Sequence, residues 1–157
     1  MKIIAHRGLV DGPDDLKQNH PEQVMAALLE GFDAEIDVWF DRGSWFLGHD
    51  QPTYQVPLSW LTTEGLWIHC KNVGAFYNLR RLVTPVNYFF HDNDLIVLTS
   101  FGNVWTYFGA PETRDPLAIC VMPEVTYDWV KIEEMANKGQ WSGFCTDYPR
   151  KLIKCLK

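Results

Sequence analysis

The chain has 157 residues, with 14 Lys and Arg against 20 Asp and Glu and with 46% hydrophobic residues, which is the composition of a folded globular domain and not of a disordered segment. Its net charge of −6 argues against nucleic-acid binding through a basic face, because such binding depends on Lys and Arg that displace phosphate counterions. No apolar run reaches the length of about 18 residues that a membrane span requires, and the N-terminal residues lack the apolar region of a secretory signal. We therefore expect a cytoplasmic protein without a membrane span.

Strands are predicted wherever apolar residues rich in Ile, Val and Phe follow one another. In chain order these runs occupy residues 2–5, 34–40, 66–70, 87–90, 95–99, 104–107, 117–122 and 142–146. Most are apolar at consecutive positions instead of alternating, which is typical of a sheet covered on both faces. We therefore expect an α/β fold with a largely parallel sheet.

Helices are predicted between several of these strands. The first covers residues 21–30, with Asn19 or His20 as a cap, Pro21 in the first turn and Gly31 after the end. A short helix is expected at 74–82, and a longer one at 126–138 is closed by Gly139. Residues 52–57 and 110–116 are expected to be loops, and 100–103 a tight turn between two strands. No linker or repeat interrupts the chain, so residues 1–157 are predicted to form one domain.

The four cysteines are expected to be free thiols. Cys70, Cys120, Cys145 and Cys155 lie far apart, and no CxxC pair suggests a zinc or redox site. Three of them fall in apolar, strand-like runs, so burial is a better interpretation than a disulfide.

Polar residues that can bind metals or anions gather at the ends of the first strands, where α/β folds place their sites. Glu35 and Asp37 are two positions apart on one strand, so their carboxylates emerge on the same face and repel unless a cation or proton joins them. A divalent ion such as Mg²⁺ or Ca²⁺ suits such oxygen ligands. Ion pairing with Arg7 or Lys71 explains the two carboxylates equally well.

Two histidines near these carboxylates suggest proton transfer. His6 and His49 each follow an apolar run, and imidazole can take and return a proton near neutral pH. Arg7 offers a planar fork that matches a phosphate oxygen pair, and Lys71 can add a second positive charge. Taken singly, His6 or His49 can also be an ordinary solvated loop residue.

The aromatic residues leave two interpretations open. A pocket for a bulkier group or ordinary core packing explains them equally well, and the residues concerned are Trp39, Tyr54, Trp105 and Tyr107. Among the other polar residues, His91 at a strand end is the one that also qualifies as a site residue.

The sequences IIAHRG, NHPE, GFDAEIDVW and WFLGHD follow one another in an order and spacing that resembles the amino-terminal half of the glycerophosphodiester phosphodiesterase family, part of the phospholipase-C-like phosphodiesterase superfamily. The resemblance is clear over the first 71 residues. Later, LWIHCKN resembles the family's third strand, ordinarily Glu-x-Lys, and GFCTDYP resembles its last strand, which ends in a Thr-Asp-x-Pro turn.

This resemblance implies a metal-dependent phosphoric diester hydrolase on a TIM-type barrel, with a glycerophosphodiester or related small phosphodiester as substrate. It assigns His6 and His49 as the general acid and base, Arg7 and Lys71 to the phosphate, and Glu35 and Asp37 to the metal.

Two departures from the family pattern affect these expectations. His69 stands where the family has a third metal carboxylate, so Mn²⁺ or Zn²⁺ joins Mg²⁺ and Ca²⁺ as a candidate ion. The chain is also shorter than the roughly 250 residues of an ordinary barrel, so several crossover helices must be missing, with helices kept after strands one, three and seven. The alternatives are a catalytically reduced phosphate-binding or regulatory barrel domain and, with less support, a phosphoinositide-cleaving enzyme on the same scaffold.

Overall fold

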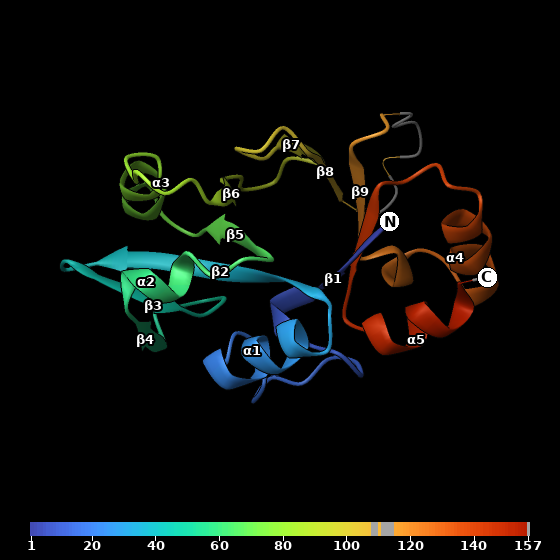
Figure 1. The fold of residues 1–157 in the computed structure, drawn as a ribbon, viewed down its shortest axis with the longest axis horizontal. Coiled ribbons are helices and arrows are strands. Elements are labelled where there is room, and N and C mark those ends of the chain that lie inside the picture. The colour runs from blue at the N-terminus through green and yellow to red at the C-terminus, as the bar shows by residue number, and fades with distance from the viewer. Residues whose placement is uncertain (108–109, 111–114, 157) are drawn as a thin grey trace.

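The computed structural model describes residues 1–107, 110 and 115–156 and shows a mixed α/β fold (Figure 1). Its described strands are β1 (Lys2–Ala5), β2 (Asp33–Asp41), β3 (Ser44–Leu47), β4 (Tyr54–Val56), β5 (Leu66–Cys70), β6 (Asn87–Phe89), β7 (Ile96–Leu98), β8 (Val104–Tyr107), β9 (Ala118–Val121) and β10 (Gly143–Thr146). The described helices are α1 (Pro21–Leu29), α2 (Leu58–Leu61), α3 (Val73–Leu79), α4 (Trp129–Asn137) and α5 (Pro149–Cys155), with 3₁₀ turns η1 (His6–Gly8) and η2 (Pro123–Val125).

The described strands form one sheet built mainly from parallel neighbours. β1 lies between β2 and β10, and parallel pairing continues through β5 to β6 on one side and through β9 to β8 on the other. The pairs β2–β3, β3–β4 and β7–β8 are antiparallel. The sheet curls, so that β6, β7 and β8 lie across from β1 and β2 (Figure 1). Since parallel strands point the same way, their carboxyl ends meet at one rim.

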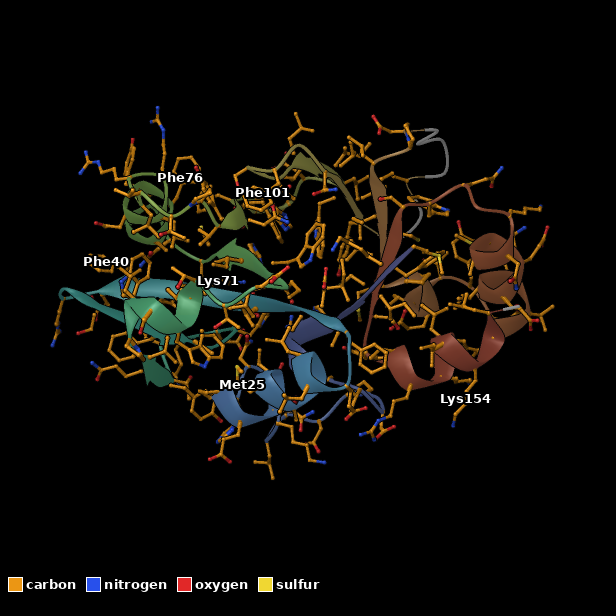
Figure 2. All side chains as sticks on the ribbon, viewed as in Figure 1. Met25, Phe40, Lys71, Phe76, Phe101 and Lys154 are labelled. Atoms are coloured by element: carbon orange, nitrogen blue, oxygen red, sulfur yellow. The ribbon has the colours of Figure 1, made fainter. Side chains whose placement is uncertain are left out.

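Both faces of the sheet are covered, and the side chains fill its interior and the space beneath the helices (Figure 2). The inner cluster joins β1, β5, β6, β8, β9 and β10 and consists of Ile4, Trp67, Phe89, Trp105, Ile119, Val121 and Cys145. On the outer face, Phe144 packs with Ile132 of α4 and Leu152 of α5. Neighbouring residues such as Phe144 and Cys145 therefore face opposite clusters, which explains why the strands are apolar at consecutive positions.

Most predicted elements are confirmed. Each predicted strand region contains a strand with slightly shifted ends, and α1, α3 and α4 correspond to the three predicted helices. α4 begins at Trp129, later than predicted, because the Asp128 side chain caps it by accepting a hydrogen bond from the backbone N of Lys131 at 2.8 Å. The turn at 100–103 is confirmed, with Thr99 N donating to Asn103 O at 2.9 Å between β7 and β8.

One predicted loop is wrong, two helices were missed, and a second predicted loop lies partly outside the described residues. Residues 52–57 are not all loop, because β4 pairs with β3 and buries Val56 opposite Trp45. The flanking Pro52 and Pro57 concealed this short strand in the sequence pattern. Helices α2 and α5 were not predicted, and α5 is held by its buried Leu152. Of the loop predicted at 110–116, residues 111–114 lie outside the described residues.

The cysteine prediction is confirmed. All four cysteines are free, and Cys70, Cys120 and Cys145 are buried. Within the part of the chain that the structure describes, no helix combines the length and apolar character needed to cross a membrane.

Candidate functional site

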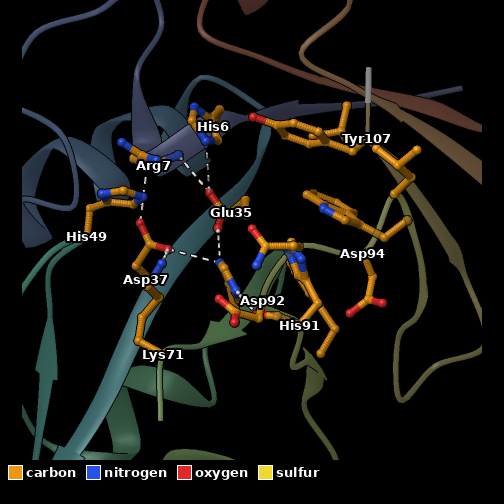
Figure 3. A pocket seen from close by; sticks show the side chains of 16 residues that line it. His6, Arg7, Glu35, Asp37, His49, Lys71, His91, Asp92, Asp94 and Tyr107 are labelled. Carbon is orange, nitrogen blue, oxygen red and sulfur yellow. Dashed lines mark hydrogen bonds and ion pairs between the residues drawn. The ribbon is translucent and has the colours of Figure 1, made fainter. Parts of the chain in front are cut away.

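The predicted site residues line one cavity at the carboxyl rim of the sheet (Figure 3). β2 and β5 run in parallel with Asp37 opposite His69, which brings these two side chains to the same level. η1 follows β1 directly and carries His6 and Arg7 to the same rim. The cavity has a volume of about 330 Å³, and the predicted residues among its lining are His6, Arg7, Glu35, Asp37, His49, His69 and Lys71.

The β2–β3 hairpin brings His49 to this cavity. β3 returns antiparallel to β2, and the backbone N of Gly48 donates to the carbonyl oxygen of Asp37 at 3.1 Å. The chain therefore reaches His49 at the level of Asp37. Its side chain is 36% exposed, and its Nδ1 lies 2.8 Å from Oδ1 of Asp50. An imidazole in this position can exchange protons with bulk water.

Glu35 and Asp37 form a buried carboxylate pair with His69 beside them. Nδ1 of His69 lies 3.1 Å from Oδ1 of Asp37 and 4.0 Å from Oε1 of Glu35. Burial, and then the charge of Asp37, raise the pKa of Glu35. Burial acts in the same direction on Asp37, but the hydrogen bond with His69 and the charge of Lys71 hold the pKa of Asp37 below its ordinary value.

Both cationic side chains of the cavity contact Asp37. Nε of Arg7 lies 3.2 Å from Oδ2 of Asp37, and Nζ of Lys71 lies 3.4 Å from Oδ1. Arg7 has a left-handed backbone with φ of 50°, in which its amide N donates to Oε2 of Glu35 at 3.1 Å while its side chain extends to Asp37. The ion pairs that the sequence offered as an alternative to a metal site are therefore present on Asp37, next to a cluster that can also hold a cation.

Asn19 is a buried site residue that the sequence interpretation missed. Its Nδ2 donates to Oδ2 of Asp37 at 2.9 Å, and its Oδ1 accepts from the backbone N of Asp37 at 2.9 Å. Asn19 was considered as a cap of α1, but His20 occupies that position and Asn19 orients Asp37 instead. Its place in the NHPE sequence was the only indication of this role in the sequence. The contact with β2 joins residues far apart in the chain, and local sequence patterns do not show such contacts.

Asp147 is the second missed residue, and it contacts His6. β1 and β10 are parallel neighbours with Ala5 opposite Thr146, so the next residues of each strand meet. Nδ1 of His6 lies 2.7 Å from Oδ1 of Asp147, and its Nε2 lies 3.9 Å from Oε2 of Glu35. Burial by itself lowers the pKa of His6, but the hydrogen bond with Asp147 and the charge of Glu35 outweigh it and raise this pKa.

Glu124 in η2 holds Asp147 in place. Its Oε1 accepts hydrogen bonds from the backbone N of Asp147 at 2.8 Å and from Oγ1 of Thr146 at 2.6 Å. The backbone of Asp147 is therefore held in place, and its carboxylate contacts His6 from a fixed position. This contact limits the rotation of the imidazole ring.

An aromatic wall fixes the orientation of His69. Its ring stacks on Phe89, with ring centroids 5.1 Å apart, and on His91, with centroids 4.6 Å apart. Burial, followed by the charges of His69 and Lys71, lowers the pKa of His91 to about 4. His91 therefore belongs to the cavity, as its position at a strand end suggested.

Two of the four aromatic residues considered line the cavity, and one of these, Trp105, is also buried in the inner cluster. Trp105 and Tyr107 line the cavity. Trp39 and Tyr54 are not among the described residues that line the cavity. Nε1 of Trp39 donates to the carbonyl oxygen of Gly48 at 2.6 Å, and the ring of Tyr54 packs on His20.

The chain matches no model of a known protein family and no curated protein. The chemistry of the site is therefore inferred from the side chains that line the cavity. It gathers a carboxylate pair, four imidazoles, one guanidinium and one ammonium group. Such a set can bind a divalent cation and an anion side by side and can move protons between them.

Proposed function

We propose that this protein is a metal-dependent phosphoric diester hydrolase that acts on a glycerophosphodiester or a related small phosphodiester. The observation that carries the proposal is the convergence of the motif residues His6, Arg7, Glu35, Asp37 and His49 on one cavity. These residues come from separate motifs of the sequence that resembles the glycerophosphodiester phosphodiesterase family. Together they supply the acid, base, anion-binding and metal-binding groups that diester hydrolysis needs.

We propose further that the curled sheet is a shortened TIM-type barrel. The unbroken order of parallel neighbours from β6 through β1 to β8 supports this, as does the cavity at the carboxyl ends of the strands. The backbone N of Ser100, in the β7–β8 turn, donates to the carbonyl oxygen of Tyr88 at 2.8 Å and so links this turn to β6. The antiparallel β7 is joined to β8 by a tight turn and therefore needs no crossover helix.

Arg7 and Lys71 would bind the phosphate group. Both side chains are largely buried at the cavity wall and are held by ion pairs with Asp37. Gln18 also accepts a hydrogen bond from Nη1 of Arg7 at 2.7 Å. Because these cationic side chains are fixed before the substrate arrives, they lose little conformational entropy when a phosphoryl oxygen binds. Most of their electrostatic attraction therefore contributes to the free energy of binding.

His6 and His49 would transfer the protons. His49, at the solvent-exposed mouth, takes a proton from the attacking water as its oxygen bonds to phosphorus. The raised pKa of His6 keeps its ring protonated at higher pH, so His6 can donate a proton to the departing alcohol oxygen as the P–O bond breaks. The products are a phosphomonoester and a free alcohol.

The residues around Glu35 fit a divalent cation. One ligand atom each from Glu35, Asp37 and His69 lie within 4.8 Å of one another, and the raised pKa of Glu35 reflects a buried carboxylate pair that a cation would stabilise. Two carboxylates and an imidazole suit Mn²⁺ or Zn²⁺ as well as Mg²⁺, whereas Ca²⁺ prefers an all-oxygen set. A bound ion would act as a Lewis acid on a phosphoryl oxygen. Asn19 and the backbone N of Arg7 keep the two carboxylates oriented toward it.

A second candidate function is phosphate binding without hydrolysis. It is favoured by one observation, that Arg7, Lys71 and His69 all contact Asp37. These contacts compensate the charge of Asp37 without a metal ion. A domain of this kind would bind a phosphodiester through Arg7 and Lys71 and release it unchanged.

Phosphorus NMR of the purified protein with a mixture of glycerophosphodiesters separates the two functions. The mixture is incubated with Mg²⁺, Ca²⁺, Mn²⁺ or Zn²⁺ in turn and then with a chelator. Metal-dependent conversion of diester to monoester signals supports the hydrolase. Line broadening of diester signals in chelator that requires the protein, with no conversion to monoester under any condition, supports the binding domain and rejects the hydrolase.

A further inference from the structure

The sheet has an open seam between β6 and β7. Of the described strands, β6 pairs with β5 and β7 pairs with β8, and no ladder joins β6 to β7. The two strands are linked beside the β7–β8 turn, where the backbone N of Ser100 donates to the carbonyl oxygen of Tyr88 at 2.8 Å and the backbone N of Tyr88 donates to Oγ of Ser100 at 2.9 Å. These bonds set Tyr88 opposite Ser100.

The edge of β7 that faces the seam offers hydrogen-bonding groups. Leu95 and Thr99 bond toward β8 through their backbone. Alternate residues of an antiparallel strand bond to the same neighbour, so the backbone groups of Ile96 and Leu98 point to the opposite edge. Within the described chain, no backbone hydrogen bond joins either residue to β6 or to residues 90–92. Residues 95–99 include no charge and no proline, so this edge lacks the features that usually protect an edge strand.

The existing link between the strands fixes the register in which the seam can close. Continued in steps of two residues, it sets Phe90 opposite Leu98 and Asp92 opposite Ile96, with residues 93–95 as the turn. Each pair would exchange two backbone hydrogen bonds. The turn contains Asn and Asp, which tolerate the left-handed backbone that three-residue hairpin loops require.

The directions of the side chains fit the same register. Phe89 and Val97 pack in the inner cluster, whereas Phe90, Ile96 and Leu98 are 42%, 52% and 69% exposed. Successive residues of a strand face opposite sides, so extending both strands would pair Phe90 with Leu98 on the outer face. This cross-strand pair would cover apolar surface that is exposed in the open form.

Closure of the seam would move the carboxylate of Asp92. In the structure Asp92 lines the candidate cavity together with Arg7 and Lys71 (Figure 3). In the closed register Asp92 shares the outer face with Phe90, because the two lie two positions apart on one strand. A carboxylate in the cavity opposes an anion that Arg7 and Lys71 attract, so its withdrawal favours the anion. By linkage, a bound anion favours closure to the same extent.

We propose that residues 90–95 form a strap that pairs β6 with β7 when an anion occupies the cavity. Residues 91–95 all line the cavity, so the same movement changes the cavity wall. The inference rests on anion binding by Arg7 and Lys71, which both proposed functions share, and it adds a conformational step to that binding.

A pair of introduced cysteines tests the closed register. In Phe90→Cys, Leu98→Cys the thiols lie opposite each other across the closed seam. In the control Phe90→Cys, Ile96→Cys they are diagonal neighbours, about 7–8 Å apart, which is too far for a disulfide. Both variants also carry Cys155→Ser, which removes the native cysteine that is not buried.

In a glutathione redox buffer, we expect the first pair to form an intramolecular disulfide with an equilibrium constant at least about tenfold larger than that of the control. Equal constants, or a disulfide that joins two copies of the chain, would overturn the strap.

Inorganic phosphate tests the coupling to the cavity. Calorimetric titration should show about threefold tighter phosphate binding by the oxidised Phe90→Cys, Leu98→Cys protein than by its reduced form, because one exposed carboxylate has left the cavity. With Asp92→Asn added, the two forms should bind phosphate equally. Equal or weaker binding by the oxidised form that retains Asp92 would overturn the coupling. If the disulfide forms in register but neither form binds phosphate, the seam still closes, and the anion binding of both proposed functions is wrong together with the coupling.

Amide hydrogen exchange in the parent protein provides a second test without any substitution. Saturating phosphate should slow exchange of the Leu98 amide, which closure pairs with Phe90. The amide of Val97, which lies opposite Trp105 of β8, is the internal control and should not change. Bound phosphate that leaves exchange of the Leu98 amide unchanged would reject the strap.

Discussion

Nδ1 of His6 lies 2.7 Å from Oδ1 of Asp147, although 141 positions separate the two residues along the chain. The parallel pairing of β1 with β10 brings them together, because each residue directly follows its strand. The contact directs Nε2 of His6 toward Glu35, 3.9 Å away. The protonation of His6 therefore depends on a carboxylate near the end of the chain.

Asp147→Asn is expected to lower the pKa of His6. Burial lowers this pKa and the Asp147 carboxylate opposes it, which leaves the pKa above its ordinary value of 6.5 in the parent protein. Without the carboxylate, His6 loses its proton at lower pH, and the alkaline limb of kcat against pH moves to lower pH with it. NMR titration of the His6 ring protons measures the same shift without any substrate.

Glu64→Gln is the matched control for this titration, because Glu64 is exposed and lies outside the cavity. The His6–Asp147 interaction also contributes to folding stability. Since the folded pKa of His6 is raised, its contribution is fully present below pH 6.5 and is lost as the pH rises through the folded value. An unchanged His6 titration in Asp147→Asn would show that Asp147 does not govern this proton.

His49→Ala is expected to reduce diester hydrolysis by about 100-fold or more, because it removes the side chain that we propose as the general base. The His49 side chain is 36% exposed, so the free energy of unfolding should change by less than about 1 kcal/mol. His20→Ala is the control, since His20 is the one histidine of the five outside the cavity lining. Hydrolysis by His49→Ala at the parent rate would remove His49 from the mechanism.

Glu35→Gln is expected to stabilise the metal-free protein while abolishing metal binding. The raised pKa of Glu35 shows that the folded protein disfavours its charge, and a neutral Gln can still accept the hydrogen bond from the backbone N of Arg7. Thermal unfolding in chelator should show a gain of about 1 kcal/mol. Added Mn²⁺ should raise the Tm of the parent and not of the variant. A variant that Mn²⁺ stabilises as much as the parent would exclude Glu35 as a ligand.

Thiol modification at pH 8 is expected to reach Cys155 first. Burial raises the pKa of Cys70 to about 12, burial followed by the charge of Glu124 raises the pKa of Cys120 to about 12, and Cys145 is buried with a raised pKa. Because the thiolate is the reactive form, these three thiols should react only after unfolding. Mass spectrometry after brief labelling should find modified Cys155, and labelling in denaturant should modify all four. Rapid labelling of Cys145 in the folded protein would contradict its burial.

Local pattern accounts for much of the fold and for part of the site. The strands were predictable because residues buried on either face of the sheet are apolar. Consecutive positions such as Phe144 and Cys145 are therefore both apolar. Glu35 and Asp37 were recognisable because alternate residues of one strand share a face. β4 was not predicted, because a strand of three residues between two prolines is too short to show a hydrophobic pattern.

The sequence by itself determined the α/β class, most of the strand positions and the motif residues, because each depends on spacing within a few residues. Only the tertiary structure decided that Asn19 orients Asp37, that Asp147 contacts His6, and that Trp105 and Tyr107 face the same cavity. These relationships depend on which strands become neighbours and in which register. Sheet closure sets both through contacts between residues far apart in the chain, and such contacts leave no periodic signal in the sequence.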